Sequence, residues 1–121
     1  MLITIDVPAR PKYLEAALSG LVALDRVVLR AQQLPELYES GIVYRREPAG
    51  QERWLRIDEM FALGYGDCED LTAARVAELQ LDGEGAYQKV RPTGWRRFHA
   101  VVRRGDGERE DPSRILGMEV R

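Results

Sequence analysis

The sequence predicts an α+β domain in which helices come first and a small antiparallel sheet follows. Apolar residues recur at steps of three and four in the first part of the chain, which is the spacing of a helix face. Beyond Gly85, short alternating runs are separated by turns rich in Gly and Pro. We therefore expect the N-terminal helices, including the one that carries the cysteine, to pack on this sheet.

The first elements are a strand, a long helix and a short helix. Residues 2–7 are rich in β-branched side chains and predict a strand that ends at Pro8. Residues 12–33 predict an amphipathic helix, and Pro35 opens a second, short helix that Gly41 closes. The apolar face of the long helix consists of Leu14, Ala17, Leu18, Leu21, Leu24, Val28 and Ala31.

The middle of the chain predicts two further helices. Residues 42–44 form a strand and residues 47–51 a loop, after which Asp58 caps a short helix through Leu63 that Gly64 ends. Asp67 is the natural N-cap of the next helix, residues 68–80. Its inward positions are Leu71, Ala74, Leu79 and either Val76 or Ala77.

The last part of the chain predicts a meander of three strands. Residues 87–90 and 96–103 form a hairpin around a turn at 92–94, and a turn at 105–107 leads to a strand at 108–111 that Pro112 ends. Arg97, His99 and Val101 share one face of the second strand. Phe98, Ala100 and Val102 share the other.

Composition and charge exclude several classes of protein. Hydrophobic residues make up 45% and charged residues 31%, as in globular domains, and 121 residues fit one domain, 1–121. The net charge of −2 leaves no excess of positive charge for phosphates, so we expect no nucleic-acid partner. The longest apolar runs are far too short to cross a bilayer, and the N-terminus has no signal-peptide pattern. We therefore expect a cytoplasmic protein without a membrane partner.

Cys68 and His99 are the only residues of their types. A single cysteine excludes an internal disulfide, and one cysteine with one histidine excludes the usual zinc sites, which need several such ligands. No cofactor or metal is expected. A lone cysteine is most often a small buried hydrophobe. At the start of a helix, however, free N–H groups favour a nucleophilic thiolate, whereas Asp67, Glu69 and Asp70 oppose it. Sequence alone leaves this balance open.

Asp111 is the expected partner of His99. The two residues are placed symmetrically about Gly105 in the predicted turn, so they should face each other across two antiparallel strands. A carboxylate in that position orients an imidazole for general base and acid catalysis.

These residues resemble the transglutaminase-like superfamily of papain-type cysteine enzymes, in particular its small bacterial and phage members. The resemblance rests on the following segments: Gly66-Asp67-Cys68-Glu69-Asp70-Leu71, Phe98-His99-Ala100-Val101-Val102, Gly105-Asp106-Gly107 and Asp111-Pro112-Ser113. It implies a single transglutaminase-like domain with Cys68 as nucleophile, His99 as general base and acid, and Asp111 as the group that orients the imidazole. The calcium sites and extra β-domains of animal transglutaminases do not fit into 121 residues.

Other residues have weaker claims. Trp54 and Tyr65 precede the cysteine and could donate to an oxyanion, as an aromatic residue does in some relatives, or could serve as core or groove wall. Asp70 is more readily explained by a structural bond to backbone or to an arginine. Arg96, Arg97, Arg103 and Arg104 predict a solvated basic face, with binding of a substrate carboxylate as the alternative.

The expected function is hydrolysis of an amide or peptide bond through a thioester on Cys68, with a peptide or protein as substrate. Two alternatives stay open: acyl transfer to an amine, and a binding or structural module that keeps the fold without turnover. A place in a phage particle also stays open, as do the substrate's identity and the oligomeric state.

Overall fold

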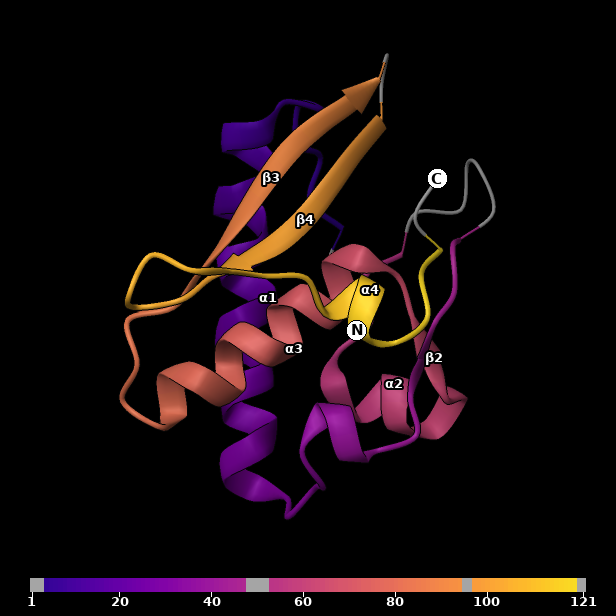
Figure 1. The fold of residues 1–121 in the computed structure, drawn as a ribbon, viewed down its shortest axis with the longest axis vertical. Coiled ribbons are helices and arrows are strands. Elements are labelled where there is room, and N and C mark those ends of the chain that lie inside the picture. Colours follow the sequence, from indigo (N-terminus) through magenta and orange to yellow (C-terminus); the bar gives the residue numbers. More distant parts are fainter. Residues whose placement is uncertain (1–3, 48–52, 95–96, 120–121) are drawn as a thin grey trace.

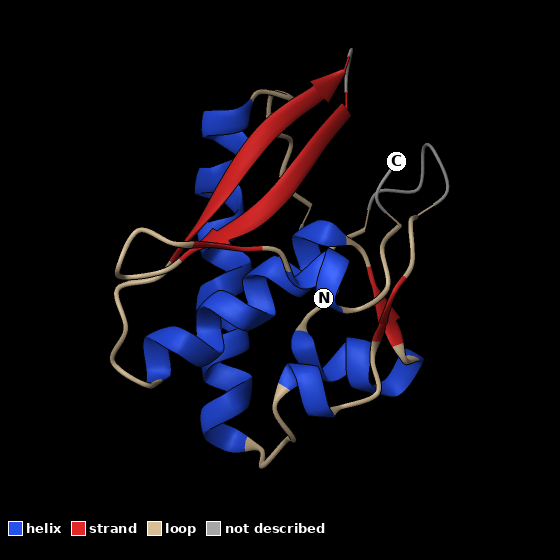
Figure 2. Ribbon diagram, in the orientation of Figure 1, coloured by secondary structure: helices blue, strands red, loops and turns tan. Residues whose placement is uncertain are grey.

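The structure is a computed structural model that describes residues 4–47, 53–94 and 97–119. In these residues the helices are α1 (Pro11–Ala31), the 3-10 helix η1 (Leu37–Glu39), α2 (Ile57–Leu63), α3 (Cys68–Leu81) and α4 (Pro112–Ile115). The strands are β1 (Val43–Tyr44), β2 (Tyr65–Gly66), β3 (Tyr87–Gly94), β4 (Arg97–Arg103) and β5 (Arg109–Glu110). The predicted α+β class is confirmed (Figures 1 and 2).

The strands form two separate sheets. The antiparallel sheet has the order β3-β4-β5, so the predicted meander is confirmed. Strand β3 continues through Gly94, past the position where the sequence predicts a turn. A second, parallel sheet of β1 and β2 pairs Tyr44 with Gly66 and was not predicted. Its pairing depends on a contact between distant segments, which local periodicity does not encode.

The predicted N-terminal strand is wrong for residues 4–7, which have no regular structure, while residues 2 and 3 lie outside the described chain. Helix α1 packs against β3 instead. The Glu15 carboxylate accepts a hydrogen bond from the Val90 N–H at 2.8 Å, and Gln88 donates to the Glu15 carbonyl at 2.9 Å. Helix α1 therefore covers this edge of the sheet.

Helix α1 begins one residue before the prediction and ends two residues before it. Its buried face contains Leu18 and Leu21 as expected, and also Val22, which was not predicted. The predicted inward positions of Leu24 and Ala31 are wrong, because Leu24 is 53% exposed and Ala31 is exposed at the helix end. Asp25 is buried in place of Leu24, and its Oδ1 accepts a hydrogen bond from the Ile57 N–H at 2.8 Å. The first residue of α2 lies against this position of α1, which explains why Asp25 faces inward.

Two short helices differ in detail from the prediction. Helix α2 begins at Ile57 with Arg56 as N-cap, whereas Asp58 lies in its first turn and binds the Arg56 side chain at 3.0 Å. The predicted cap at Asp58 is therefore wrong by two residues. Gly64 ends the helix as expected, with a φ of +83° that favours glycine. The expected helix after Pro35 is only the single turn η1.

Helix α3 lies at the centre of the molecule. It contacts α1 on one side and β4 on another (Figure 1). Val76 and Ala77 are both fully buried, so the helix is apolar on more of its surface than one stripe. No helix of the described residues is long and apolar enough to cross a membrane.

Candidate active site

Cys68 is the first residue of α3, and its neighbours explain why the helix begins there. Asp67 is the N-cap, as predicted, and its Oδ1 accepts hydrogen bonds from the N–H groups of Glu69 at 3.1 Å and Asp70 at 3.2 Å. Gly66 precedes the cap, and a Cβ at this position would collide with the Met60 sulfur. The glycine lets β2 approach α2 and α3 closely.

The surroundings of Cys68 favour the neutral thiol. The side chain is 8% exposed, and its Sγ donates a hydrogen bond to Glu69 Oε2 at 3.2 Å. Burial raises the pKa of Cys68, and the negative charges of Glu69 and Asp67 raise it further, whereas a hydrogen bond from the Ala100 backbone lowers it. The net pKa lies well above its ordinary value. Burial is the largest cause of this shift, and the charges of Glu69 and Asp67 add to it.

His99 and Asp111 are brought together. His99 Nε2 lies 2.8 Å from Asp111 Oδ2, and the two side chains are 12% and 11% exposed. Burial raises the pKa of Asp111, but the hydrogen bond and charge of His99 together with the Arg114 backbone outweigh it, and the net pKa is lowered. The carboxylate therefore holds the imidazole through Nε2, and Nδ1 is the nitrogen left for another group.

The register that joins these two residues differs from the prediction. Val102 pairs with Glu110 and Arg103 with Arg109, so the turn is centred on Asp106 rather than Gly105. Asp111 does not lie directly opposite His99 on a third strand. It follows β5 as the N-cap residue of α4, and its side chain reaches His99 diagonally.

Helix α3 and strand β4 bring Cys68 to the histidine strand. The Ala100 backbone contacts Cys68, as its effect on the thiol pKa indicates, and the Thr72 hydroxyl donates to the Ala100 carbonyl at 3.1 Å. Because His99 precedes Ala100 directly, the only cysteine and the only histidine lie on adjoining segments of two packed elements.

Tyr44 is a site residue that sequence reasoning missed. Strand β1 pairs it with Gly66, two residues before Cys68. Burial raises the pKa of Tyr44, and the charges of Cys68 and Asp67 raise it further. The parallel pairing of β1 and β2 creates this contact, and no local motif indicates it.

The two predicted aromatic donors have packing roles in the described structure. Trp54 is partly buried against the core cluster that includes Cys68. Tyr65 lies on β2, with the Arg45 guanidinium 4.7 Å above its ring. Both positions agree with a wall beside the site.

The acidic residues around Cys68 cap the helix and hold the preceding segment. Asp70 is fully buried and accepts hydrogen bonds from the N–H groups of Leu55 at 2.7 Å and Asp67 at 3.1 Å, so it has the structural bond to backbone that we expected. Burial raises the pKa of both Asp67 and Asp70 to about 8, and their mutual charge adds to this for Asp70.

Oxygens of Glu47, Asp67 and Asp70 lie within 4.8 Å of one another, and they are the carboxylates that could hold a cation among the residues described. Backbone hydrogen bonds already occupy Asp67 Oδ1 and both Asp70 oxygens.

Comparison with protein-family models, with curated proteins and with solved structures found no match to this chain. The transglutaminase-like resemblance therefore remains an interpretation of the motifs. The function is inferred from the geometry of the site itself.

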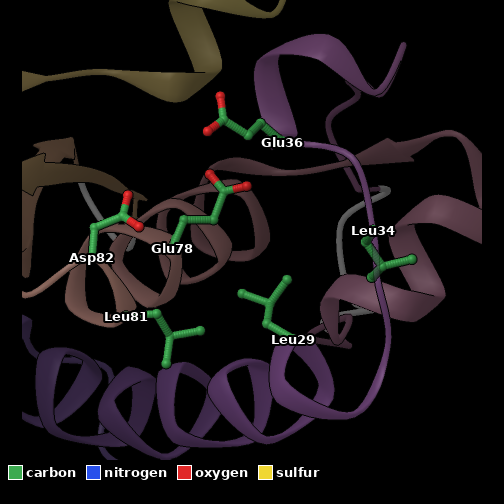
Figure 3. Close-up of a pocket in the computed structure, with 6 residues that line it drawn as sticks. All are labelled: Leu29, Leu34, Glu36, Glu78, Leu81 and Asp82. Carbon is green, nitrogen blue, oxygen red and sulfur yellow. The ribbon is translucent and has the colours of Figure 1, made fainter.

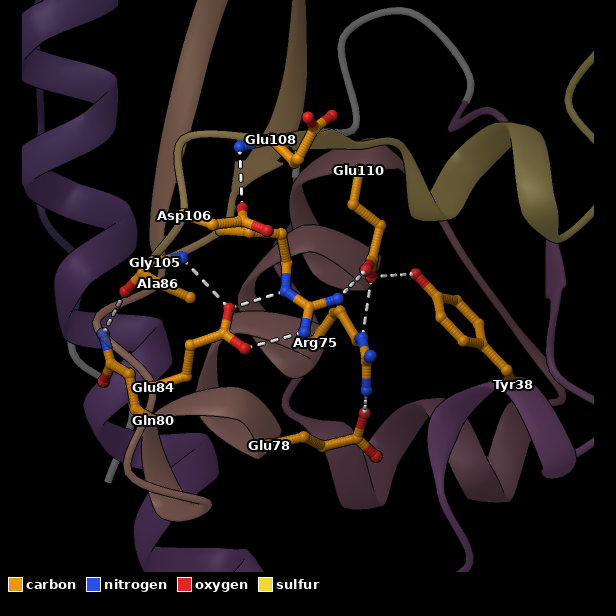
Figure 4. A network of polar contacts seen from close by, with 11 residues as sticks. Tyr38, Arg75, Glu78, Gln80, Glu84, Ala86, Gly105, Asp106, Glu108 and Glu110 are labelled. Atoms are coloured by element: carbon orange, nitrogen blue, oxygen red, sulfur yellow. Dashed lines mark hydrogen bonds and ion pairs between the residues drawn. The ribbon is translucent and has the colours of Figure 1, made fainter.

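A network of charged side chains holds the strand that precedes Asp111 (Figure 4). Glu110 Oε2 accepts hydrogen bonds from Tyr38 at 2.5 Å and Arg75 at 2.7 Å, and Glu110 Oε1 accepts one from Arg104 at 2.8 Å. Arg104 also binds Glu84 in a two-pronged ion pair. Its predicted role in a purely solvated basic face is therefore wrong.

The other predicted basic residues differ among themselves. Arg97 is exposed, as expected of a solvated face. Arg103 is half-buried and donates to the Gly107 carbonyl at 3.4 Å, whereas Arg96 lies outside the described residues.

A separate pocket of about 200 Å³ lies at the C-terminal end of α3, at the opposite end of that helix from Cys68 (Figure 3). Its lining combines apolar side chains with carboxylates: Leu29, Leu34, Glu36, Glu78, Leu81 and Asp82. Glu78 accepts a hydrogen bond from the Leu37 N–H at 2.8 Å, so it anchors η1. The pocket is not part of the cysteine site.

Proposed function

We propose that this chain is a cysteine-dependent amide or peptide hydrolase with Cys68, His99 and Asp111 as its catalytic triad, in a small transglutaminase-like domain of the bacterial or phage type. The observation that carries the proposal is the 2.8 Å contact between His99 and Asp111, made on a strand that packs against the helix start bearing Cys68. Covalent catalysis requires an oriented base that can reach the nucleophile, and His99 is oriented by Asp111 on an element that packs against the helix of Cys68. The side-chain hydrogen bond that the Cys68 sulfur makes in this structure is to Glu69, so the sulfur must turn from Glu69 toward His99 for the reaction. The expected location is the cytoplasm, or a phage particle.

The raised thiol pKa decides how the nucleophile is activated. Because Cys68 holds its proton at neutral pH, His99 Nδ1 takes that proton as the sulfur attacks the substrate carbonyl carbon. The tetrahedral intermediate then collapses, the C–N bond breaks, and the imidazolium gives its proton to the leaving amine. A water, deprotonated by His99, attacks the thioester, and the acid leaves as the thiol is restored.

The start of α3 offers donors for the developing oxyanion. Asp67 uses the N–H groups of Glu69 and Asp70, so the N–H of Cys68 is the one in the first turn that the cap does not use. The phenol of Tyr44, on the strand that pairs with the segment before Cys68, is the candidate for a second donor. Trp54 and Tyr65 then act as walls for a peptide or protein substrate.

Hydrolysis is favoured over acyl transfer because the described chain around the site is short. Only residues 82–86 separate α3 from β3, and a tight turn joins β4 to β5. An enzyme that passes its acyl group to an amine must exclude water, which calls for a lid or tunnel. The connections of the described chain offer no segment long enough for such a cover, which supports the hydrolase.

A non-catalytic binding module is the second candidate, and one observation favours it. Cys68 is buried and hydrogen-bonded to Glu69, as an inert core cysteine could also be. The two candidates differ in whether the sulfur ever becomes acylated.

The test incubates the protein with a peptide library and with an electrophilic peptide probe, and maps both products by mass spectrometry. We expect the probe to be attached to Cys68 and the peptides to be cleaved. Cys68→Ala and His99→Ala should each abolish the cleavage. Ser19→Ala is the control, because it removes an exposed hydroxyl on α1. This variant should cleave the peptides at the wild-type rate. Absence of cleavage and of probe labelling in the wild type would reject the hydrolase in favour of the binding module.

A further inference from the structure

Thr72 makes an unusual hydrogen bond for a helical threonine. It lies one turn after Cys68 on the same face of α3 and is fully buried. A helical threonine hydroxyl commonly bonds back to a carbonyl of its own helix. The Thr72 hydroxyl instead crosses to strand β4 and donates to the Ala100 carbonyl at 3.1 Å.

The Ala100 backbone is open to this contact because of the strand pairing. Ala100 lies opposite Val90 of β3, but the Val90 N–H bonds to the Glu15 carboxylate on the far side of that strand. Val90 and Ala100 are therefore a non-hydrogen-bonded pair, and the N–H and C=O of Ala100 point toward the β5 edge.

Strand β5 does not reach this part of the edge. Its last residue, Glu110, pairs with Val102, so within the described residues no strand pairs with β4 at Ala100 on the edge away from β3. Helix α3 takes the place of the missing strand. Cys68 contacts the Ala100 backbone, and Thr72 takes the Ala100 carbonyl.

A second link holds the same helix face farther along. Arg75 follows Cys68 by seven residues, two turns later, and its Nε donates to Glu110 Oε2 at 2.7 Å. Thr72 lies between this ion pair and Cys68. Its hydroxyl contact joins the first turns of α3 to β4 at Ala100.

We propose that Thr72 is a positioning residue that sets Cys68 against His99. The inference rests on the proposed function, because it assigns Thr72 a role in that same site. The hydroxyl holds the first turn of α3 at Ala100, whose neighbour carries the imidazole, and so fixes the approach of the sulfur to His99 Nδ1. A displacement of about 1 Å between reacting groups is enough to cost on the order of 10²-fold in rate.

A purely structural role would act differently. If Thr72 only satisfied a buried carbonyl, its removal would lower stability and leave the reactivity of the folded site unchanged. A positioning role changes the dependence of Cys68 reactivity on pH in the folded protein. The two roles are therefore separable.

The experiment measures the rate at which iodoacetamide modifies Cys68 between pH 5 and 9, roughly the span in which imidazoles and thiols titrate. The full chain has a single cysteine, so every adduct counted by mass spectrometry reports on it. The variants are Thr72→Val, which keeps the shape but removes the hydroxyl, Thr72→Ser, which keeps the hydroxyl, and His99→Ala. Ser40→Ala is the matched control, since the Ser40 hydroxyl also donates to a carbonyl, that of Leu37, away from β4. Denaturant unfolding of each variant confirms that folded protein is compared.

We expect Thr72→Val to lose the His99-dependent reactivity below pH 8 by about 10- to 10²-fold and to approach the profile of His99→Ala. Thr72→Ser and Ser40→Ala should keep the wild-type profile. The imidazole signals of His99, the only histidine, should shift in Thr72→Val and stay in place in Ser40→Ala when measured by NMR.

A wild-type profile in folded Thr72→Val overturns the positioning role and leaves the proposed function standing. Identical profiles in the wild type and His99→Ala overturn both. Should Thr72→Val not fold, Thr72→Ala replaces it in the same comparison with Thr72→Ser, and equal profiles of those two again overturn the inference.

Discussion

His99 Nε2 lies 2.8 Å from Asp111 Oδ2 although the two residues are not directly opposed in the sheet. Asp111 reaches the imidazole from the first position beyond β5, where the chain turns into α4. The contact therefore depends on where β5 ends. The residues that hold this strand end are as relevant to the site as the triad itself.

The first prediction concerns the Asp111 carboxylate. Asp111→Asn should lower the rate of Cys68-dependent peptide cleavage by about 10²- to 10⁴-fold, because an amide neither stabilises the imidazolium nor fixes the same tautomer. Initial rates on a cleaved peptide measure this. Asp106→Asn is the matched control in the neighbouring turn, where Asp106 Oδ1 accepts a hydrogen bond from Glu108. An Asp111→Asn enzyme as fast as the Asp106→Asn enzyme would remove Asp111 from the triad.

The second prediction concerns the network that holds β5. Glu110→Gln should lower the free energy of unfolding by about 1–3 kcal/mol, because Arg75, Arg104 and Tyr38 lose a charged acceptor in a largely buried setting. Chemical denaturation measures this. Glu84→Gln, at the exposed end of the same network, should have a much smaller effect. If the two variants lose the same free energy of unfolding, the burial of Glu110 does not strengthen its ion pairs.

The sequence predicted the parts of this site that local patterns encode. The Asp67 cap, the helix start at Cys68 and the hairpin carrying His99 follow from capping chemistry and strand periodicity. The pairing of His99 with Asp111 was expected from symmetry about the turn, but the true register is shifted and the contact is diagonal.

Long-range contacts account for what could not be predicted. Tyr44 reaches the site only because β1 pairs with β2 in parallel, across a separation of about twenty residues. Asp25 is buried where the periodicity predicted Leu24, because its carboxylate receives the first N–H of α2. Neither contact has a signature in the local sequence.

The third prediction concerns stability and pH. Burial raises the pKa of Asp25 to about 7, with Asp70 adding to the shift and the Ile57 hydrogen bond opposing it. In the unfolded chain an aspartate has a pKa of about 3.9. Between these values the folded protein holds a proton that the unfolded chain has released. The free energy of unfolding should therefore fall as pH rises from about 4 to 7, on the order of 1.4 kcal/mol per pH unit for this group.

Asp25→Asn tests this dependence. The amide keeps an oxygen for the Ile57 N–H but has no proton to lose. The free energy of unfolding should therefore fall less steeply between about pH 4 and 7, and the remaining dependence on pH is the part that Asp67 and Asp70 contribute. Denaturant unfolding at a series of pH values measures it. Asp82→Asn, an exposed position at the end of α3, should leave the slope as in the wild type. An unchanged slope in Asp25→Asn would mean that Asp25 is ionised in the folded protein.

The fourth prediction concerns the charge beside the sulfur. Burial raises the pKa of Cys68 most, and the Glu69 charge is the next largest cause. Glu69→Gln should therefore lower the thiol pKa, which ultraviolet absorbance of the thiolate measures. Glu36→Gln removes an equal charge at the other end of α3 and should not alter it. If both variants titrate as the wild type does, the Glu69 charge does not act on Cys68.

The fifth prediction separates hydrolysis from acyl transfer. Addition of a millimolar primary amine to a cleavage reaction should leave the free acid as the main product, because the short connections of the described chain around the site offer no cover that would keep water from a thioester. Mass spectrometry of the products measures the two fractions. A dominant amine adduct would replace the hydrolase with a transferase, and Cys68→Ala should abolish both products.

The most direct measurement of the proposed triad is the alkylation rate of Cys68 from pH 5 to 9, compared between the wild type and His99→Ala, over roughly the range in which imidazoles and thiols titrate. The raised thiol pKa makes unaided reaction slow in this range, so any reactivity near neutral pH must come from a base beside the sulfur. We expect the wild type to react already near neutral pH, and His99→Ala to react only as the solution becomes alkaline. Superimposable profiles in the two proteins would contradict the triad and identify Cys68 as a buried structural thiol.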